Sequence, residues 1–245
     1  MSHNELFEPL QSGFRIRHST ETALIKITTD LLNAADNGLI SILILLDLSA
    51  AFDTVSYSIL LTRISELIGL RGSALSWFPS YLFNRKQYVT LKDANSTLAP
   101  VNHGVPQGSV LGPLLFTRYM LPLGQIIRHH GLSFHCYADD TQLYISTKPS
   151  TQLPPGPLIN CLQKLKTWMT SNLLKLNSNK TELMVVGPKS LLRKVGDLLL
   201  EVDGCSITPS PVVRNLGVIL DPTLLFQSHI KNVTRSAFHH LKNIA

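Results

Sequence analysis

The sequence predicts an α+β fold, in one large domain or two small ones. Apolar residues recur at helical spacing in several segments and form short runs of strand length in others. The two kinds of segment mix without strict alternation, which disfavours a series of parallel βαβ units. The chain has 245 residues, 44% hydrophobic and only 16% charged, which is enough for an ordinary core and excludes a disordered chain.

The first element expected in the chain is a strand. The apolar run Leu39–Leu46 predicts that this strand is buried on both faces. Helical spacing through Leu60 and Ile64 predicts a helix after it. A second helix is expected around Ser73–Phe83, where Pro79 should kink it or end its first half. The segments after it are expected to be a strand at Gln87–Leu91, a loop at Pro100–Pro106 and a helix from near Ser109 past Met120.

The second half begins with a predicted hairpin. Leu132–Tyr137 and Thr141–Ile145 both have strand composition, and the residues between them place two carboxylates at the tip. A proline-rich loop, Lys148–Pro157, separates the hairpin from an amphipathic helix at Leu158–Leu173. The last predicted elements are strands at Glu182–Val186 and Val212–Ile219 and a helix from Phe226 to Leu241.

Charge and cysteine content narrow the class of protein. Lysine and arginine number 22 against 16 acidic residues, a net charge of +6 that favours a polyanionic partner such as nucleic acid. Residues 1–12 have no apolar core of a signal peptide, and no apolar run is long enough to span a bilayer. Three widely spaced cysteines indicate a reducing compartment. We therefore expect an intracellular protein, nuclear or cytoplasmic, with no membrane partner.

Acidic residues end two of the predicted strands. Asp47 follows Leu39–Leu46, and Asp139 and Asp140 follow Leu132–Tyr137. Carboxylates at strand ends can share hard divalent cations, and two such cations support phosphoryl transfer. The alternative is that Asp47 caps a helix and the Asp-Asp pair merely forms a turn.

Six segments resemble, in order, the reverse transcriptases of non-LTR (LINE-like) retrotransposons, and together they cover nearly the whole chain from about Leu6. Motifs A, B and C of that family match Leu46–Val55, Gly104–Phe116 and Tyr137–Asp140. The finger segment before motif A, motif D and the primer-grip motif E match Gln11–Thr20, Leu176–Glu182 and Asn215–Asp221.

The resemblance implies a right-hand polymerase with a palm sheet. The expected divisions are partial fingers at 1–38, a palm at 39–222 with a finger-like segment at about 73–103, and the start of a thumb at 223–245. Asp47 and Asp139 would hold two Mg²⁺ ions, or Mn²⁺, with Asp140 beside them. The implied activity is RNA-directed DNA polymerisation, which extends a primer with deoxynucleoside triphosphates on an RNA or DNA template.

The resemblance also implies roles for residues around the carboxylates. Phe52 stands where an aromatic gate would exclude a ribose 2′-hydroxyl; the alternative is a core residue. Gln107 and Gly108 would approach the nucleotide or template closely. Without the resemblance, the same residues would be read as an ordinary loop before a helix with Ser109 as its N-cap.

Four further groups of residues are expected to make contacts. Lys180 would assist the departure of pyrophosphate, or be a solvated turn residue. Arg15 and Arg17 would grip phosphates, or be exposed loop residues. The primer grip would be Leu216, Gly217 and Val218. In the last helix Lys231, Arg235, His239 and Lys242 form a basic stripe that suits a phosphate backbone or is simply the solvated face.

The chain departs from the family pattern in places. Ser56-Tyr57 replaces a common Asp-His, and His103 replaces a common cysteine. No endonuclease and no Arg-Pro-Ile-Ser finger segment precede residue 1, and the thumb stops soon after its first helix begins. The expectation is a copy truncated at both ends or an excised reading frame. The alternative function is a non-catalytic relic that keeps the palm fold and binds nucleic acid; no oligomeric state is predicted.

Overall fold

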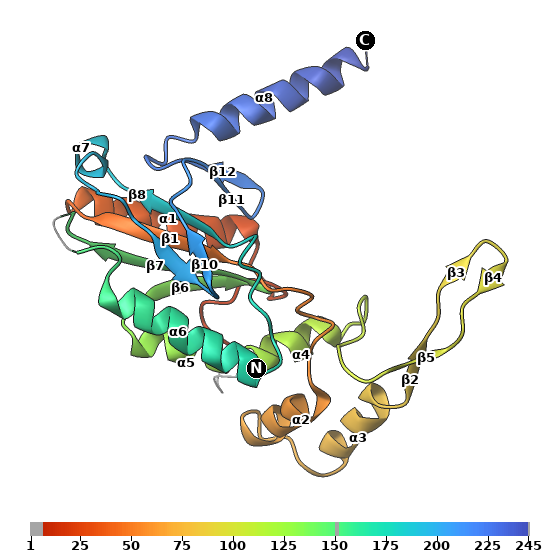
Figure 1. The fold of residues 1–245 in the computed structure, drawn as a ribbon. Helices are drawn as coiled ribbons and strands as arrows, with labels where there is room; N and C mark the ends of the chain where they lie inside the picture. Colours follow the sequence, from red (N-terminus) through yellow and green to blue (C-terminus); the bar gives the residue numbers. More distant parts are fainter. Residues whose placement is uncertain (1–6, 150–151, 245) are drawn as a thin grey trace.

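A four-stranded antiparallel sheet lies at the centre of the computed structural model, which describes residues 7–149 and 152–244 (Figure 1). The strand order is β6-β7-β1-β8. The strands are β1 (Ile40–Leu46), β6 (Ser133–Tyr137), β7 (Asp140–Thr147) and β8 (Glu182–Val186). β1 is buried on both faces, as predicted, because it pairs with a strand on each side and has helices above and below it.

Helices cover both faces of this sheet (Figure 1). On one face, Ile27 and Leu31 of α1 (Thr20–Asp36) pack in one buried cluster with Leu43 of β1. On the other, α5 (Pro122–His129) and α6 (Gly156–Ser171) share a larger cluster with Ile42. This alternation of neighbouring side chains to opposite faces follows from the two-residue period of a strand.

Helix α1 was not anticipated. Its buried residues step by three or four, and Ser19 caps its first turn in a capping box with Thr22. Its exposed side chains include Ile25 and Leu32, which weaken the contrast between an apolar and a polar face. The helical pattern is therefore present at 20–36 but weak, which is why no helix is expected there from the sequence.

The helices beyond β1 are α2 (Tyr57–Glu66), α3 (Gly72–Leu82) and α4 (Gly112–Tyr119). Helix α3 continues through Pro79 to Leu82, so of the two expected effects of that proline, ending the first half of the helix is wrong. The predicted single helix from Ser109 past Met120 is instead two helices, α4 and α5. Pro122 takes the first position of α5, where its missing N–H costs no hydrogen bond.

A long hairpin lies between α3 and α4 and extends away from the sheet (Figure 1). At its base β2 (Arg85–Gln87) pairs with β5 (Ala99–Val101), and at its tip β3 (Thr90–Leu91) pairs with β4 (Ala94–Asn95). Most of its side chains are exposed. The predicted strand at 87–91 is therefore one arm of this hairpin, and the predicted loop at 100–106 begins within the other arm.

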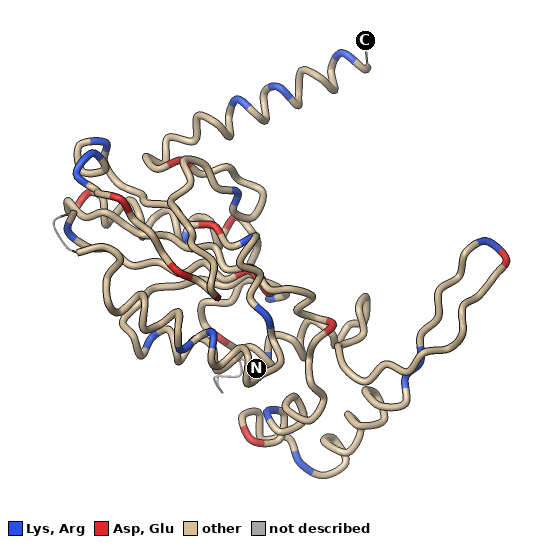
Figure 2. The backbone as a smooth tube through the Cα atoms, viewed as in Figure 1, with Lys and Arg blue, Asp and Glu red and all other residues tan. Residues whose placement is uncertain are grey.

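The C-terminal part adds short elements and a final helix. They are α7 (Lys189–Leu192), β9 (Leu200–Val202), β10 (Cys205–Ile207), β11 (Val213–Asn215), β12 (Val218–Leu220) and α8 (Gln227–Lys242). The predicted strand at 212–219 is in fact the β11–β12 hairpin, which turns at Leu216 and Gly217, both with positive φ. Helix α8 extends away from the sheet with no buried residue, and Figure 2 marks Lys and Arg positions along its length in blue.

The apolar face and the basic face of α8 are both solvent-exposed. Ile230, Val233 and Leu241 are exposed together with the basic residues. None of the helices in the described part of the chain is long and apolar enough to cross a membrane.

Candidate functional site

Asp47 directly follows β1, and the backbone at residues 47 and 48 is bonded to the segment around residues 176–177. The Asn177 N–H donates to the Asp47 carbonyl oxygen at 2.9 Å, and Leu48 forms an isolated antiparallel bridge with Leu176. The segment that resembles motif D therefore lies against the segment that resembles motif A. These backbone contacts fix where the Asp47 side chain leaves the sheet.

The other two carboxylates come from the β6–β7 hairpin. Tyr137 pairs with Asp140, so the turn contains only Ala138 and Asp139, and Asp140 is the first residue of β7 rather than a turn residue as expected. The next residue of β7, Thr141, pairs with Leu46, the last residue of β1. All three aspartates thus lie at the same end of two adjacent strands.

The carboxylates affect one another's protonation. The pKa of Asp140 is raised to about 6 by desolvation and by the charges of Asp139 and Asp47. Although the Asp140 side chain keeps contact with solvent, the surrounding protein removes part of its hydration. The pKa of Asp139 is also raised, by burial first and then by Asp47.

Only partial compensation exists for this negative charge. The Lys180 ammonium lies 3.8 Å from Asp47 Oδ2, and 71% of the Lys180 side chain is exposed. This distance is beyond a hydrogen bond, and the buried Oδ2 has no hydrogen-bond donor among the described residues. The charges and the free oxygen fit a cation, yet across residues 7–149 and 152–244 no three acidic, His or Cys side chains converge as a ready coordination shell.

A cavity of about 170 Å³ opens beside these carboxylates. Asp47, Asp140 and Lys180 line it together with Leu216 from the turn of the β11–β12 hairpin. The structure therefore brings one expected primer-grip residue to the carboxylates. Gly217 has φ +88° beside open space, and Val218 begins β12.

Phe52 lies between the core and the surface. Its ring stacks on the buried Phe116 ring, with centroids 4.3 Å apart, and the Phe14 ring is T-shaped to it, with centroids 6.2 Å apart. Phe52 is half-buried, which fits both the gate and the core interpretation.

The loop of motif B packs on the same segment. Val105 N–H donates to the Phe52 carbonyl, and Gln107 Nε2 donates to Asp53 Oδ1 at 2.8 Å. Gly108 has φ +75° with nothing within 4 Å of where a side chain would start, so its backbone is open to an approaching molecule. Ser109 does not cap α4 at its N-cap position, which Leu111 occupies, but its Oγ accepts from the Gly112 N–H.

The two arginines differ. Arg15 Nη1 donates to the Pro9 carbonyl at 3.0 Å and lies 3.4 Å from the Glu8 and Gln11 carbonyls, so it folds over its own segment. Arg17 is exposed. Neither lines the cavity beside the carboxylates.

Three buried or tightly packed residues were missed from the sequence. Gln142 and Asn215 are buried, line the cavity and are joined by a hydrogen bond of 3.2 Å, which links β7 to the β11–β12 hairpin. A side chain at Gly104 would start 2.9 Å from the Asp53 backbone. Gly104 could have been singled out from the sequence because it is a glycine inside motif B. Gln142 and Asn215 could not, because a polar residue in a strand gives no sign that it is buried.

The fold and the site are those of a right-hand polymerase, with a group of carboxylates at one end of the central sheet. Solved telomerases share this fold. Apo telomerase from Candida tropicalis aligns with a TM-score of 0.59 at 12% identity, over 88% of this chain and 40% of that one. Telomerase from Candida albicans, solved with a fragment of telomeric RNA, gives 0.54 at 14% identity, over 82% and 33%.

Sequence comparison then identifies the family. The profile of the family described as "Reverse transcriptase (RNA-dependent DNA polymerase)" matches residues 1–220, so the chain belongs to the reverse transcriptase family. It is 28% identical to "Probable RNA-directed DNA polymerase from transposon BS" of Drosophila melanogaster, over 100% of this chain. It is 27% identical to the RNA-directed DNA polymerase of mobile element jockey from the same organism, over 92%. The chain spans about a quarter of the length of these curated relatives, 27% and 24%. The resemblance to non-LTR reverse transcriptases is confirmed.

Proposed function

We propose that this chain carries the catalytic centre of an RNA-directed DNA polymerase, which adds deoxynucleotides to a primer 3′-hydroxyl on an RNA or DNA template. The observation that carries the proposal is that Asp47, Asp139 and Asp140 lie at the same end of β1 and the β6–β7 hairpin, where burial, and then the neighbouring carboxylates, raise the pKa of Asp139 and Asp140. Such crowding of like charges is costly unless a cation compensates it.

Two Mg²⁺ ions, or Mn²⁺, are the proposed compensating cations. Asp47 and Asp139 would hold them, with Asp140 adjacent, because carboxylate oxygens are the ligands that hard cations prefer. When bound, these ions would activate the attacking primer hydroxyl and neutralise charge on the leaving pyrophosphate. The buried Asp47 Oδ2, which lacks a hydrogen-bond donor among the described residues, supports this assignment.

The chain's own residues would position the other reactants. Lys180 has an exposed ammonium at the edge of the carboxylates and would offset the charge of departing pyrophosphate. Phe52 would face the sugar of the incoming nucleotide, while Gln107 and Gly108 would lie against its base or the template. Leu216, Gly217 and Val218 would support the primer, and Arg15 and Arg17 would contact phosphates.

The division into subdomains is part of the proposal. We assign partial fingers to 1–38, the palm to 39–222 with a finger-like segment at about 73–103, and the start of the thumb to 223–245. The projecting hairpin supports the finger-like segment, and the separate course of α8 supports the thumb (Figure 1). Packing of α1 against the sheet ties residues 20–36 closely to the palm. Three free cysteines fit a reducing location in the nucleus or cytoplasm.

Magnesium-dependent primer extension on RNA and DNA templates tests the function. The wild-type chain should extend a primer, and Asp139→Asn should lower the rate at least about a hundredfold while the Kd for template–primer stays nearly constant. Asp93→Asn, in the exposed tip of the long hairpin, is the matched control. Binding without extension by the wild-type chain would support the non-catalytic alternative, and an Asp139→Asn variant as fast as the wild type would refute the metal assignment.

A further inference from the structure

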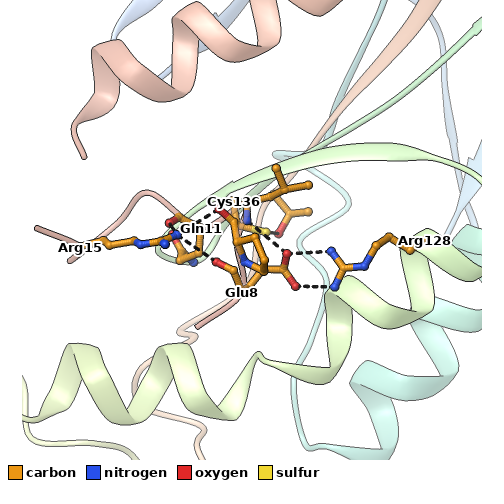
Figure 3. A network of polar contacts seen from close by, with 8 residues as sticks. Glu8, Gln11, Arg15, Arg128 and Cys136 are labelled. Carbon is orange, nitrogen blue, oxygen red and sulfur yellow. Dashed lines mark hydrogen bonds and ion pairs between the residues drawn. The ribbon is translucent and has the colours of Figure 1, made fainter. Parts of the chain in front are cut away.

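The strand that leads to the catalytic turn is covered along its free edge. β6 is an edge strand of the sheet, and residues 10–12 lie beside it. Cys136 N–H donates to the Leu10 carbonyl at 2.8 Å, and Ser12 N–H donates to the Cys136 carbonyl at 2.9 Å. The start of this segment is anchored by the Glu8–Arg128 ion pair, whose nitrogen–oxygen distances are both 2.8 Å (Figure 3).

From this segment the Gln11 side chain reaches the turn itself. Its Nε2 donates to the Ala138 carbonyl at 3.0 Å, and its Oε1 accepts from the Ala138 N–H at 2.9 Å and from the Gly13 N–H at 2.7 Å. The amide orientation follows from these neighbours, because two backbone N–H groups can pair only with the carbonyl oxygen. Gln11 is 4% exposed, so water does not compete for these bonds.

The backbone that Gln11 grips is strained. Ala138 has φ +58°, in the left-handed region that residues with a side chain rarely adopt. It is the first residue of the two-residue turn and precedes Asp139. Gly13 packs against it so closely that a side chain there would start 2.3 Å from the Ala138 nitrogen. The conformation of Ala138 therefore depends on what surrounds it, because an isolated alanine prefers other regions.

We propose that Gln11 is a positioning residue for polymerisation. Its amide, the clamp, bonds both backbone groups of Ala138, holds the turn in its strained form and so sets the directions of the Asp139 and Asp140 carboxylates. A primary amide suits this task because it donates and accepts from one rigid plane, which a carboxylate, an ammonium or an apolar side chain of that length does not. The catalytic part of this inference rests on the proposed function.

Two variants of the same buried segment separate the clamp from general stability. Gln11→Met keeps the length of the side chain and removes all three hydrogen bonds. Ser12→Ala is the matched control, because Ser12 is also buried and its Oγ bonds His135 on β6 at 2.8 Å without touching the turn. If Gln11→Met does not fold, Gln11→Glu replaces it, since it keeps the two accepted bonds and loses only the bond to the Ala138 carbonyl.

The first measurement is hydrogen exchange of the Ala138 amide in protein without metal ions, which needs no activity. Exchange should accelerate about tenfold in Gln11→Met, relative to amides elsewhere in β6 and β7, and stay unchanged in Ser12→Ala. The second is primer extension. Gln11→Met should lower kcat about tenfold and raise the Mg²⁺ concentration for half-maximal rate, with the nucleotide KM and the template–primer Kd within about twofold of wild type.

The outcomes distinguish the clamp from the proposed function. Unchanged exchange and unchanged kcat in a folded Gln11→Met protein would overturn the proposal, and so would an equal loss of kcat in Ser12→Ala. A wild-type chain that extends no primer would refute the proposed function and the catalytic role of Gln11 with it. The exchange data would in that case still decide whether Gln11 holds the turn.

Discussion

Replacing Asp140 with asparagine should raise the melting temperature of the protein at pH 8 in the absence of divalent ions and change it little at pH 4. The pKa of Asp140 is raised from an ordinary 3.8 to about 6 in the folded chain. Because the unfolded chain then gives up this proton more readily than the folded one, the folded state is penalised as pH rises. The penalty is absent below pH 3.8, grows up to about pH 6 and is constant above it. Asparagine carries no charge, so the variant escapes the penalty.

The size of the effect follows from that shift. A change of about two pKa units corresponds to about 3 kcal/mol between the two protonation states. Asp140 is exposed, so solvent screening reduces this free energy to about 1 kcal/mol. For a chain of 245 residues that corresponds to a melting temperature higher by about 2–4 °C.

Thermal unfolding followed by circular dichroism at the two pH values measures the difference. Asp93→Asn, at the tip of the long hairpin, serves as the control and should leave the melting curve unchanged. Excess Mg²⁺ should shrink the advantage of Asp140→Asn, since bound cations stabilise the folded wild type. A lower melting temperature at pH 8, or the same gain at both pH values, would show that the folded protein does not penalise the charged form of Asp140.

Three further outcomes are expected. Phe52→Val should raise ribonucleotide over deoxynucleotide incorporation about ten- to a hundredfold if the ring faces the sugar; a changed melting temperature with an unchanged incorporation ratio would make Phe52 a core residue only. Gly104→Ala should destabilise the fold by about 1–3 kcal/mol in a urea titration, because φ is +85° and the new side chain would meet the Asp53 backbone at 2.9 Å; an unchanged midpoint would contradict that packing. Binding of a template–primer duplex, measured by fluorescence anisotropy, should weaken steeply with added salt through counterion release. A Kd that does not change with salt would mean that the net charge of +6 does not contribute to binding nucleic acid.

The central strands and the carboxylates were predictable because their signals are local. An uninterrupted apolar run predicts β1, and the short spacing between two β-rich segments predicts the β6–β7 hairpin and places Asp139 in its turn. The family resemblance then linked Asp47 to the same site, and the structure places it at the same end of the sheet.

Other features depend on distant partners, which composition does not reveal. The bonds between Gln11 and Ala138 could not be predicted from the sequence, because the two residues are far apart in the chain and meet only where residues 10–12 lie beside the edge strand β6. The Gln142–Asn215 pair is hidden for the same reason. Pro79 lies inside α3, and the helix continues past it to Leu82 although the proline removes a backbone hydrogen bond; the sequence signal for a helix end is therefore not decisive there.

The pairing of β1 with β7 also governs how the site assembles as the protein folds. These strands are neighbours in the sheet, yet α2, α3, the long hairpin, α4, α5 and β6 all lie between them in the chain. Loop-closure entropy rises only slowly with loop length, so a longer or shorter hairpin should alter stability little. Contacts between such distant segments form late in folding, whereas helices form early. A refolded preparation can therefore have its full helical signal before Asp47 and Asp140 are brought together, so recovery of helix content is a poor measure of whether the carboxylate site has formed.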